Sequence, residues 1–154
     1  SARSPPGSSD RRDVATSRPR RLLQMRSLAR AFSAQLTPPN RNPTTLRMMP
    51  TPLYRYTLAA DDPQLIDGAI FVFSQGTDPE VLLLIEAKRA AATGAERSNW
   101  QYGLARMSSL PMQVSLDNSV IWETEWARSR DQTGTYFVHK STKPDDVIIE
   151  VFDN

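Results

Sequence analysis

The residues with the clearest chemical potential are one acidic side chain and an acid–x–lysine triplet further along the chain. Asp67 stands just before the apolar segment 69–73, and Glu86 and Lys88 come at the end of the apolar segment 81–87. We expect the two segments to form a hairpin, because only turn-forming residues separate them. Glu86 and Lys88 then share a face, since alternate strand residues point the same way. These three residues therefore carry the sharpest chemical hypothesis that the sequence offers.

This arrangement resembles the PD-(D/E)XK nuclease family, in which an acidic residue on one strand and acid–x–Lys on the next form the site. The resemblance implies that Asp67 and Glu86 hold Mg²⁺ and that Lys88 orients the water or assists the transition state. Gln101 and Tyr102 resemble the Gln and Tyr that often follow this motif. The competing interpretation, which we favour because the motif is short, is an ordinary ion pair at a strand end.

The charge of the chain changes abruptly at Met48 and Met49. Residues 1–47 contain ten Arg and two Asp, with no Lys or Glu, and sum to +8. Residues 48–154 contain nine Lys or Arg and fifteen Asp or Glu, and sum to −6. We therefore expect residues 1–47 to be a disordered Arg-rich tail, with a possible short amphipathic helix over 20–36, and residues 48–154 to be the folded domain.

Three explanations for residues 1–47 remain open. An Arg-rich and Ser-rich stretch that is poor in acidic residues is typical of organelle transit peptides. A basic arm could also bind phosphates by counterion release. The third explanation, which we favour, is that these residues are not part of the native protein and are translated from upstream of the true start.

The pattern after residue 48 predicts an α+β domain with a single antiparallel or mixed sheet of six to seven strands and one main helix. The predicted strands cover residues 53–58, 69–73, 81–87, 112–116, 120–126, 135–140 and 147–152. The helix is predicted over residues 98–109, because Ser98 and Gln101 have capping-box spacing and Pro111 prevents its continuation.

Aromatic and titratable residues supply further candidates. We expect Trp100 and Trp122 in the core, whereas Trp126 ends its strand beside Arg128 and Arg130 and could form a binding patch for an acidic or aromatic partner. A lone strand histidine, His139, is expected to be structural. The acidic pairs at 61–62 and 145–146 stand beside prolines, where turn or cap duty explains them best.

Our first expectation is therefore a soluble, non-enzymatic binding or interaction domain with an unknown protein or small-molecule ligand and no favoured cofactor. The alternatives are a Mg²⁺-dependent nuclease or phosphodiesterase and a nucleic-acid or anionic-surface binder that uses the basic tail. The chain has no Cys, which is compatible with a cytoplasmic location. Its longest apolar run, residues 81–85, is far shorter than a membrane span, so we expect no membrane partner.

Overall fold

A computed structural model describes residues 13–59, 62–89, 98–126 and 147–151. Its helix and the strands of its smaller sheet are α1 (Arg18–Ala29), β1 (Phe32–Leu36), β2 (Thr44–Thr45), β8 (Met112–Leu116) and β9 (Ser119–Thr124). The strands of its larger sheet are β3 (Arg47–Met48), β4 (Tyr54–Ala59), β5 (Asp62–Gln75), β6 (Asp78–Arg89), β7 (Ser98–Arg106) and β10 (Val147–Val151).

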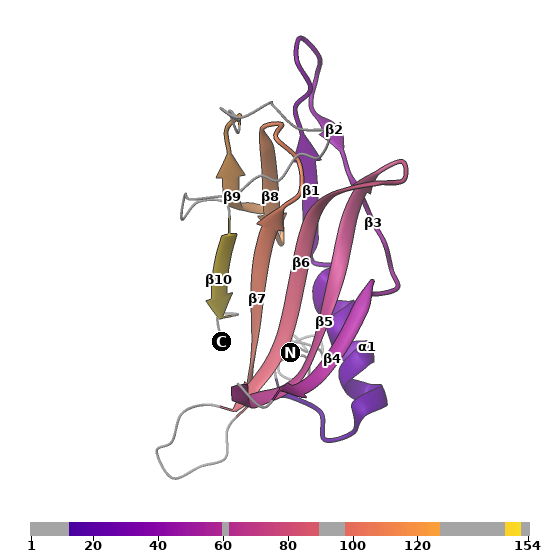
Figure 1. The fold of residues 1–154 in the computed structure, drawn as a ribbon, viewed down its shortest axis with the longest axis vertical. Coiled ribbons are helices and arrows are strands. Elements are labelled where there is room, and N and C mark those ends of the chain that lie inside the picture. Colours follow the sequence, from indigo (N-terminus) through magenta and orange to yellow (C-terminus); the bar gives the residue numbers. More distant parts are fainter. Residues whose placement is uncertain (1–12, 60–61, 90–97, 127–146, 152–154) are drawn as a thin grey trace, which may run out of the picture.

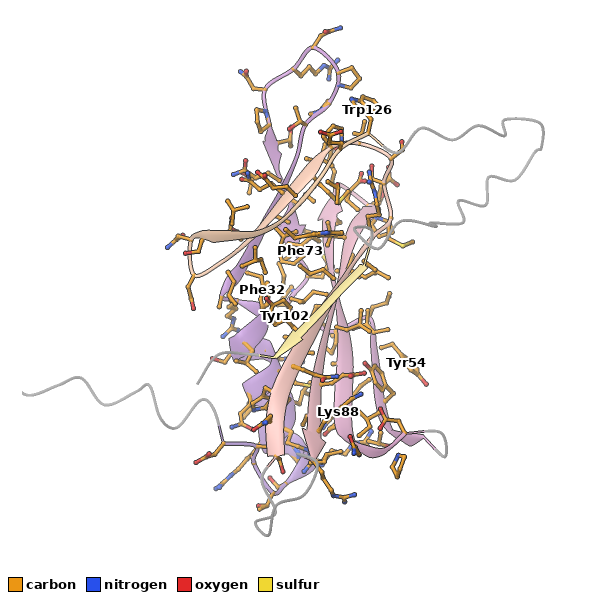
Figure 2. The ribbon with its side chains drawn as sticks, turned by 90° about the vertical axis from the view of Figure 1, so that its left-hand side faces the viewer. Phe32, Tyr54, Phe73, Lys88, Tyr102 and Trp126 are labelled. Carbon is orange, nitrogen blue, oxygen red and sulfur yellow. The ribbon has the colours of Figure 1, made fainter. Side chains whose placement is uncertain are left out.

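Both sheets are antiparallel, and they lie in two layers (Figure 1). The smaller sheet has four strands in the order β2-β1-β8-β9. The larger sheet has six strands in the order β10-β7-β6-β5-β3, and β4 pairs with β5 beside β3. The smaller sheet and α1 lie against the same face of the larger sheet (Figure 2). We call this covered face the inner face and the opposite one the outer face.

Local turn chemistry explains the hairpins. Asp117 and Asn118 both have positive φ, 47° and 66°, as the two-residue turn between β8 and β9 requires. Gly76 has a φ of 63° in the turn between β5 and β6. The long β5–β6 hairpin carries a register shift between Phe73 and Ser74, where β6 contains one extra residue, Glu80.

The core lies between the inner face and the elements that cover it. Alternate residues of β5, β6 and β7 are buried there, which is the period that a strand with one covered face must show. Phe32 of β1 meets Tyr102 of β7 edge to face, with ring centroids 5.1 Å apart (Figure 2). The fully buried apolar side chains of the large sheet include Ala69, Phe71, Val81, Leu83, Ile85, Ala87 and Leu104.

The expected single sheet with one main helix is wrong. The described residues form two sheets, and strand β7 occupies most of the segment predicted as the helix. Strand β7 pairs with β6 along its whole length: Arg106 lies opposite Val81 at one end, and Ser98 lies opposite Arg89 at the other. The spacing of Trp100 and Leu104 suits one helix face, but with Tyr102 it also suits one strand face. Pairing with β6 decides between them, because tertiary contacts override weak local preference.

The expected disordered tail before residue 48 is also wrong for residues 13–47. They form α1, β1 and β2, and they place Met25, Ala29, Phe32 and Leu36 in the core with at most 5% exposure. The predicted helix over 20–36 ends at Ala29, because residues 32–36 pair with β8. The arginines misled the prediction: Arg21, for example, binds a carboxylate that lies 46 residues away in the sequence.

Several strand predictions are confirmed. Segments 69–73, 81–87 and 112–116 lie in β5, β6 and β8. Segments 53–58, 120–126 and 147–152 overlap β4, β9 and β10 with ends that differ by one or two residues. The predicted strand 135–140 falls outside the described residues. In the described part of the chain, no helix has both the length and the apolar character that crossing a bilayer requires.

Candidate functional site

The register of the β5–β6 hairpin separates the two carboxylates that the sequence suggested as a metal site. Asp67 pairs with Ala87, whereas Glu86 pairs with Gly68. Because paired residues share a face, Asp67 lies on the inner face and Glu86 on the outer face. The predicted triplet is therefore only half assembled: Glu86 and Lys88 lie together, but Asp67 is on the other side of the sheet.

Asp67 is completely buried and holds two arginines from other elements. Its Oδ2 accepts from Arg21 Nε of α1 at 2.8 Å and from Arg55 Nη2 of β4 at 2.6 Å, and its Oδ1 accepts from Arg55 Nε at 3.0 Å. The Arg55 Nη2 also donates to the Arg18 carbonyl at 2.6 Å. Asp67 thus ties the first turn of α1 to the large sheet.

The charges around Asp67 control its ionisation. Burial acts to raise the pKa of Asp67, but the hydrogen bonds from Arg55 and Arg21 outweigh it and hold the pKa below the ordinary value. The carboxylate is therefore charged at neutral pH and already occupied by two guanidinium groups. This arrangement is that of a structural ion cluster, and it leaves Asp67 unsuited to binding a metal ion.

On the outer face, Glu86 is the centre of a hydrogen-bond network that crosses three strands. Its Oε1 accepts from Tyr56 Oη of β4 at 2.7 Å, and its Oε2 accepts from Gln101 Nε2 of β7 at 2.7 Å. Lys88 Nζ lies 3.5 Å from the same Oε2. Because both carboxylate oxygens have donors, the network fixes the surrounding side chains more than it offers a free base.

Lys88 also binds the start of β5. Its Nζ donates to Asp62 Oδ2 at 2.7 Å. This hydrogen bond lowers the pKa of Asp62 and raises the pKa of Lys88. Both groups are partly exposed, so the pair resembles the strand-end ion pair that we favoured from the sequence. The carboxylate nearest to Lys88 is that of Asp62, and Glu86 is farther away.

Gly68 leaves the space through which the Tyr56 side chain reaches Glu86. The Tyr56 ring lies across Gly68, so that a Cβ at that position would overlap Tyr56 Cε2. The ring therefore reaches over β5 to Glu86 on β6 only because residue 68 has no side chain. Burial, and then the hydrogen bond and charge of Glu86, raise the pKa of Tyr56 above its ordinary value.

An exposed apolar surface that the sequence analysis did not identify lies beside this network. Met49, Leu53 and Tyr54 are 38%, 70% and 62% exposed and follow one another closely in the chain. Register places Tyr54 on the outer face, where it pairs with Ile70, which pairs with Leu84 in turn. We call these five residues the outer-face patch. Figure 2 shows Tyr54 on the side of the large sheet away from α1. A sequence signal existed: apolar residues surround Pro50 and Pro52, in a segment that cannot continue as a buried strand.

The remaining predicted site residues are only partly placed. Trp100 and Trp122 are 3% and 5% exposed, whereas Trp126 is 47% exposed. The two arginines expected to accompany Trp126, the histidine expected to be structural and three of the four paired acidic residues lie outside the described part of the chain: Arg128, Arg130, His139, Asp61, Asp145 and Asp146. Among the described residues, no group of three or more His, Cys, Asp or Glu side chains could hold a metal ion.

These features define an antiparallel two-sheet protein with one helix and with a polar network beside an exposed apolar patch. The chain matches no protein-family model, no curated protein and no solved structure. Its function is therefore inferred from its own geometry.

Proposed function

We propose that this chain is a non-enzymatic binding domain that recognises another protein through the outer-face patch. The observation that carries the proposal is the concentration of exposed apolar side chains. Met49, Leu53 and Tyr54 belong to one stretch of six residues, whereas the other large exposed apolar side chains among the described residues are spread more widely along the chain: Leu23, Met107, Val120 and Trp126. Contiguous exposed apolar surface is typical of interaction sites.

The backbone beneath the patch is held in place. Met49 N–H donates to the Val72 carbonyl at 2.9 Å, and Leu53 N–H donates to the Ile70 carbonyl at 2.7 Å. Pro50 and Pro52 lie between them and have no N–H to offer an incoming strand. These features favour recognition by side chains over strand addition, on a surface that loses little conformational entropy on binding.

The polar network supports the same surface. Tyr54 stacks on Tyr56 with ring centroids 6.2 Å apart and an interplanar angle of 20°. Tyr56 is fixed in turn by its hydrogen bond to Glu86. Tyr54 is therefore an aromatic side chain that is both exposed and oriented before binding, and such residues are enriched among those that dominate binding energy.

The two alternatives receive less support. A Mg²⁺-dependent nuclease of the predicted type needs Asp67 and Glu86 at one cation, and the hairpin register places them on opposite faces. An anion-binding basic segment would still have Arg18, Arg20 and Arg30 exposed, but Arg21 is held by Asp67. No specific contact in the described residues favours either alternative over the patch.

Site-specific photo-crosslinking tests the proposal. The full chain would carry a photoreactive amino acid at position 54 in its native cells, with position 57 as the control. Thr57 is an exposed residue of the same strand that pairs with Asp67 and so belongs to the inner side. We expect a discrete protein adduct from position 54 that Leu53→Ser abolishes. No adduct at 54, or equal adducts at both positions, would contradict the proposal.

A further inference from the structure

Helix α1 has a first turn that is unfavourable for an isolated helix. Three of its first four residues are Arg18, Arg20 and Arg21, and that turn contains no acidic residue. The N-cap residue Ser17 makes no side-chain capping hydrogen bond. Positive charge at a helix N-terminus opposes the helix dipole, and a 12-residue helix is marginal in water even without that penalty.

The apolar contacts of α1 are few. Only Met25 and Ala29 of this helix are fully buried, Leu22 and Leu28 are partly buried, and Leu23 is 63% exposed. The helix contacts β5 and β6 on the inner face of the large sheet. Burial of two side chains, one of them a single methyl group, gives α1 a weak hydrophobic attachment for its length.

The charge that this helix lacks is supplied by the sheet. Asp67 of β5 binds Arg21, and Arg55 binds both Asp67 and the Arg18 carbonyl. Arg21 Nη1 also donates to the Ala15 and Thr16 carbonyls at 3.2 and 2.7 Å. One buried carboxylate therefore organises the first turn of α1 and the residues that lead into it.

We propose that α1 is a conditional helix, an order–disorder switch that is locked in its docked state by Asp67. When the lock is broken, α1 unfolds and leaves the inner face, while the β5–β6–β7 sheet, which has its own extensive pairing, stays folded. Release frees Arg21, so that it joins the exposed Arg18 and Arg20 in a continuous basic segment. The docked state thus withholds part of the positive charge of this segment from an anionic partner.

Hydrogen exchange read by mass spectrometry tests the switch at neutral pH. In Asp67→Asn, peptides from residues 18–29 should exchange almost as fast as an unfolded chain, at least about tenfold faster than in wild type, while peptides from β5 and β6 remain strongly protected. Asp62→Asn is the matched control, because it removes a carboxylate of the same strand that pairs with Lys88 instead. Unchanged protection of α1 would overturn the proposal, and so would equal residual protection of the α1 and sheet amides in the variant.

A second measurement covers the case in which Asp67→Asn does not fold. In the wild-type protein with low concentrations of urea, exchange of the α1 amides should be faster than that of the β6 amides and almost independent of urea, which is the signature of local opening. If the α1 and β6 amides exchanged through one common, urea-dependent opening, α1 would be part of the global unfolding unit and the switch would not exist.

Discussion

Asp67 and Glu86 lie on adjacent strands of one sheet, yet their carboxylates are on opposite faces of it. A single extra residue causes this separation. Ser74 pairs with Pro79, and the same register continued along both strands would pair Asp67 with Glu86. Glu80 interrupts it, so that Phe73 pairs with Val81 and Asp67 with Ala87. A shift of one residue moves every later side chain of the strand to the other face.

Acid should release the lock at Asp67. Because the pKa of Asp67 is lowered in the folded protein, its contribution is fully present above its ordinary value of 3.8 and is lost as pH falls through the depressed folded value. We expect Asp67→Asn to cost about 3–5 kcal/mol of unfolding free energy at neutral pH, because it leaves two arginines without their counter-charge. Urea unfolding at several pH values measures both effects.

The outcome that supports this account is a difference in unfolding free energy between wild type and Asp67→Asn that becomes smaller below about pH 4. At that pH the wild-type carboxyl also becomes protonated, so that both proteins lack the negative charge. Asp62→Asn should cost much less at neutral pH, since Asp62 is partly exposed. If the difference in unfolding free energy between wild type and Asp67→Asn stayed constant down to about pH 2, Asp67 would not act through its charge.

Tyr56 should remain protonated through the ordinary range of tyrosine ionisation. Because its pKa is raised, Tyr56 keeps its phenolic proton in the folded state at pH values where the unfolded chain loses it. The contribution of protonated Tyr56 to the unfolding free energy is therefore fully present below the ordinary pKa of 10.0 and is lost as pH rises above it. Absorbance titration of wild type and Tyr56→Phe should give equal changes around pH 10. Glu86→Gln should move the Tyr56 transition to lower pH, because the neighbouring negative charge is gone. If wild type showed the absorbance change of one more ionising tyrosine around pH 10 than Tyr56→Phe, the pKa of Tyr56 would not be raised and the prediction would be wrong.

Gly68→Ala should push the Tyr56 ring away from Glu86. The new Cβ would overlap Tyr56 Cε2, so the expected loss of stability is about 1–3 kcal/mol. In a Tyr56→Ala background the clash is absent, and the same substitution should cost much less. Chemical denaturation of the four proteins completes the cycle. Equal costs in both backgrounds would mean that Gly68 is needed for another reason.

The sequence predicted the parts of this fold that local patterns determine. Asp117 and Asn118 identify the β8–β9 turn, and the apolar run 81–85 identifies a covered strand. Trp100 and Leu104 could belong to a helix or a strand, and only pairing with β6 settles the choice. The role of Arg21 could not be predicted, because its partner Asp67 is 46 residues away. The candidate metal site failed at Glu80, since nothing in the local pattern signals an extra residue in the hairpin.

The tryptophans should differ in their access to solvent as the sequence suggested. Trp100 and Trp122 are nearly buried and Trp126 is 47% exposed, so iodide should quench Trp126 predominantly. Trp126→Phe should remove most of the quenchable fluorescence and leave the unfolding midpoint almost unchanged, because an exposed side chain contributes little to stability. Strong quenching that persists in Trp126→Phe would show that one of the other two indoles is accessible.

The most direct test of the outer-face patch is the affinity of the purified chain for the partner that position 54 captures. Leu53→Ser should weaken binding at least about fivefold, since a central apolar contact contributes more than about 1 kcal/mol. Val120→Ser is the control, because Val120 is 51% exposed but belongs to the smaller sheet. The account predicts loss of affinity in Leu53→Ser alone. Equal affinity of wild type and Leu53→Ser would contradict it.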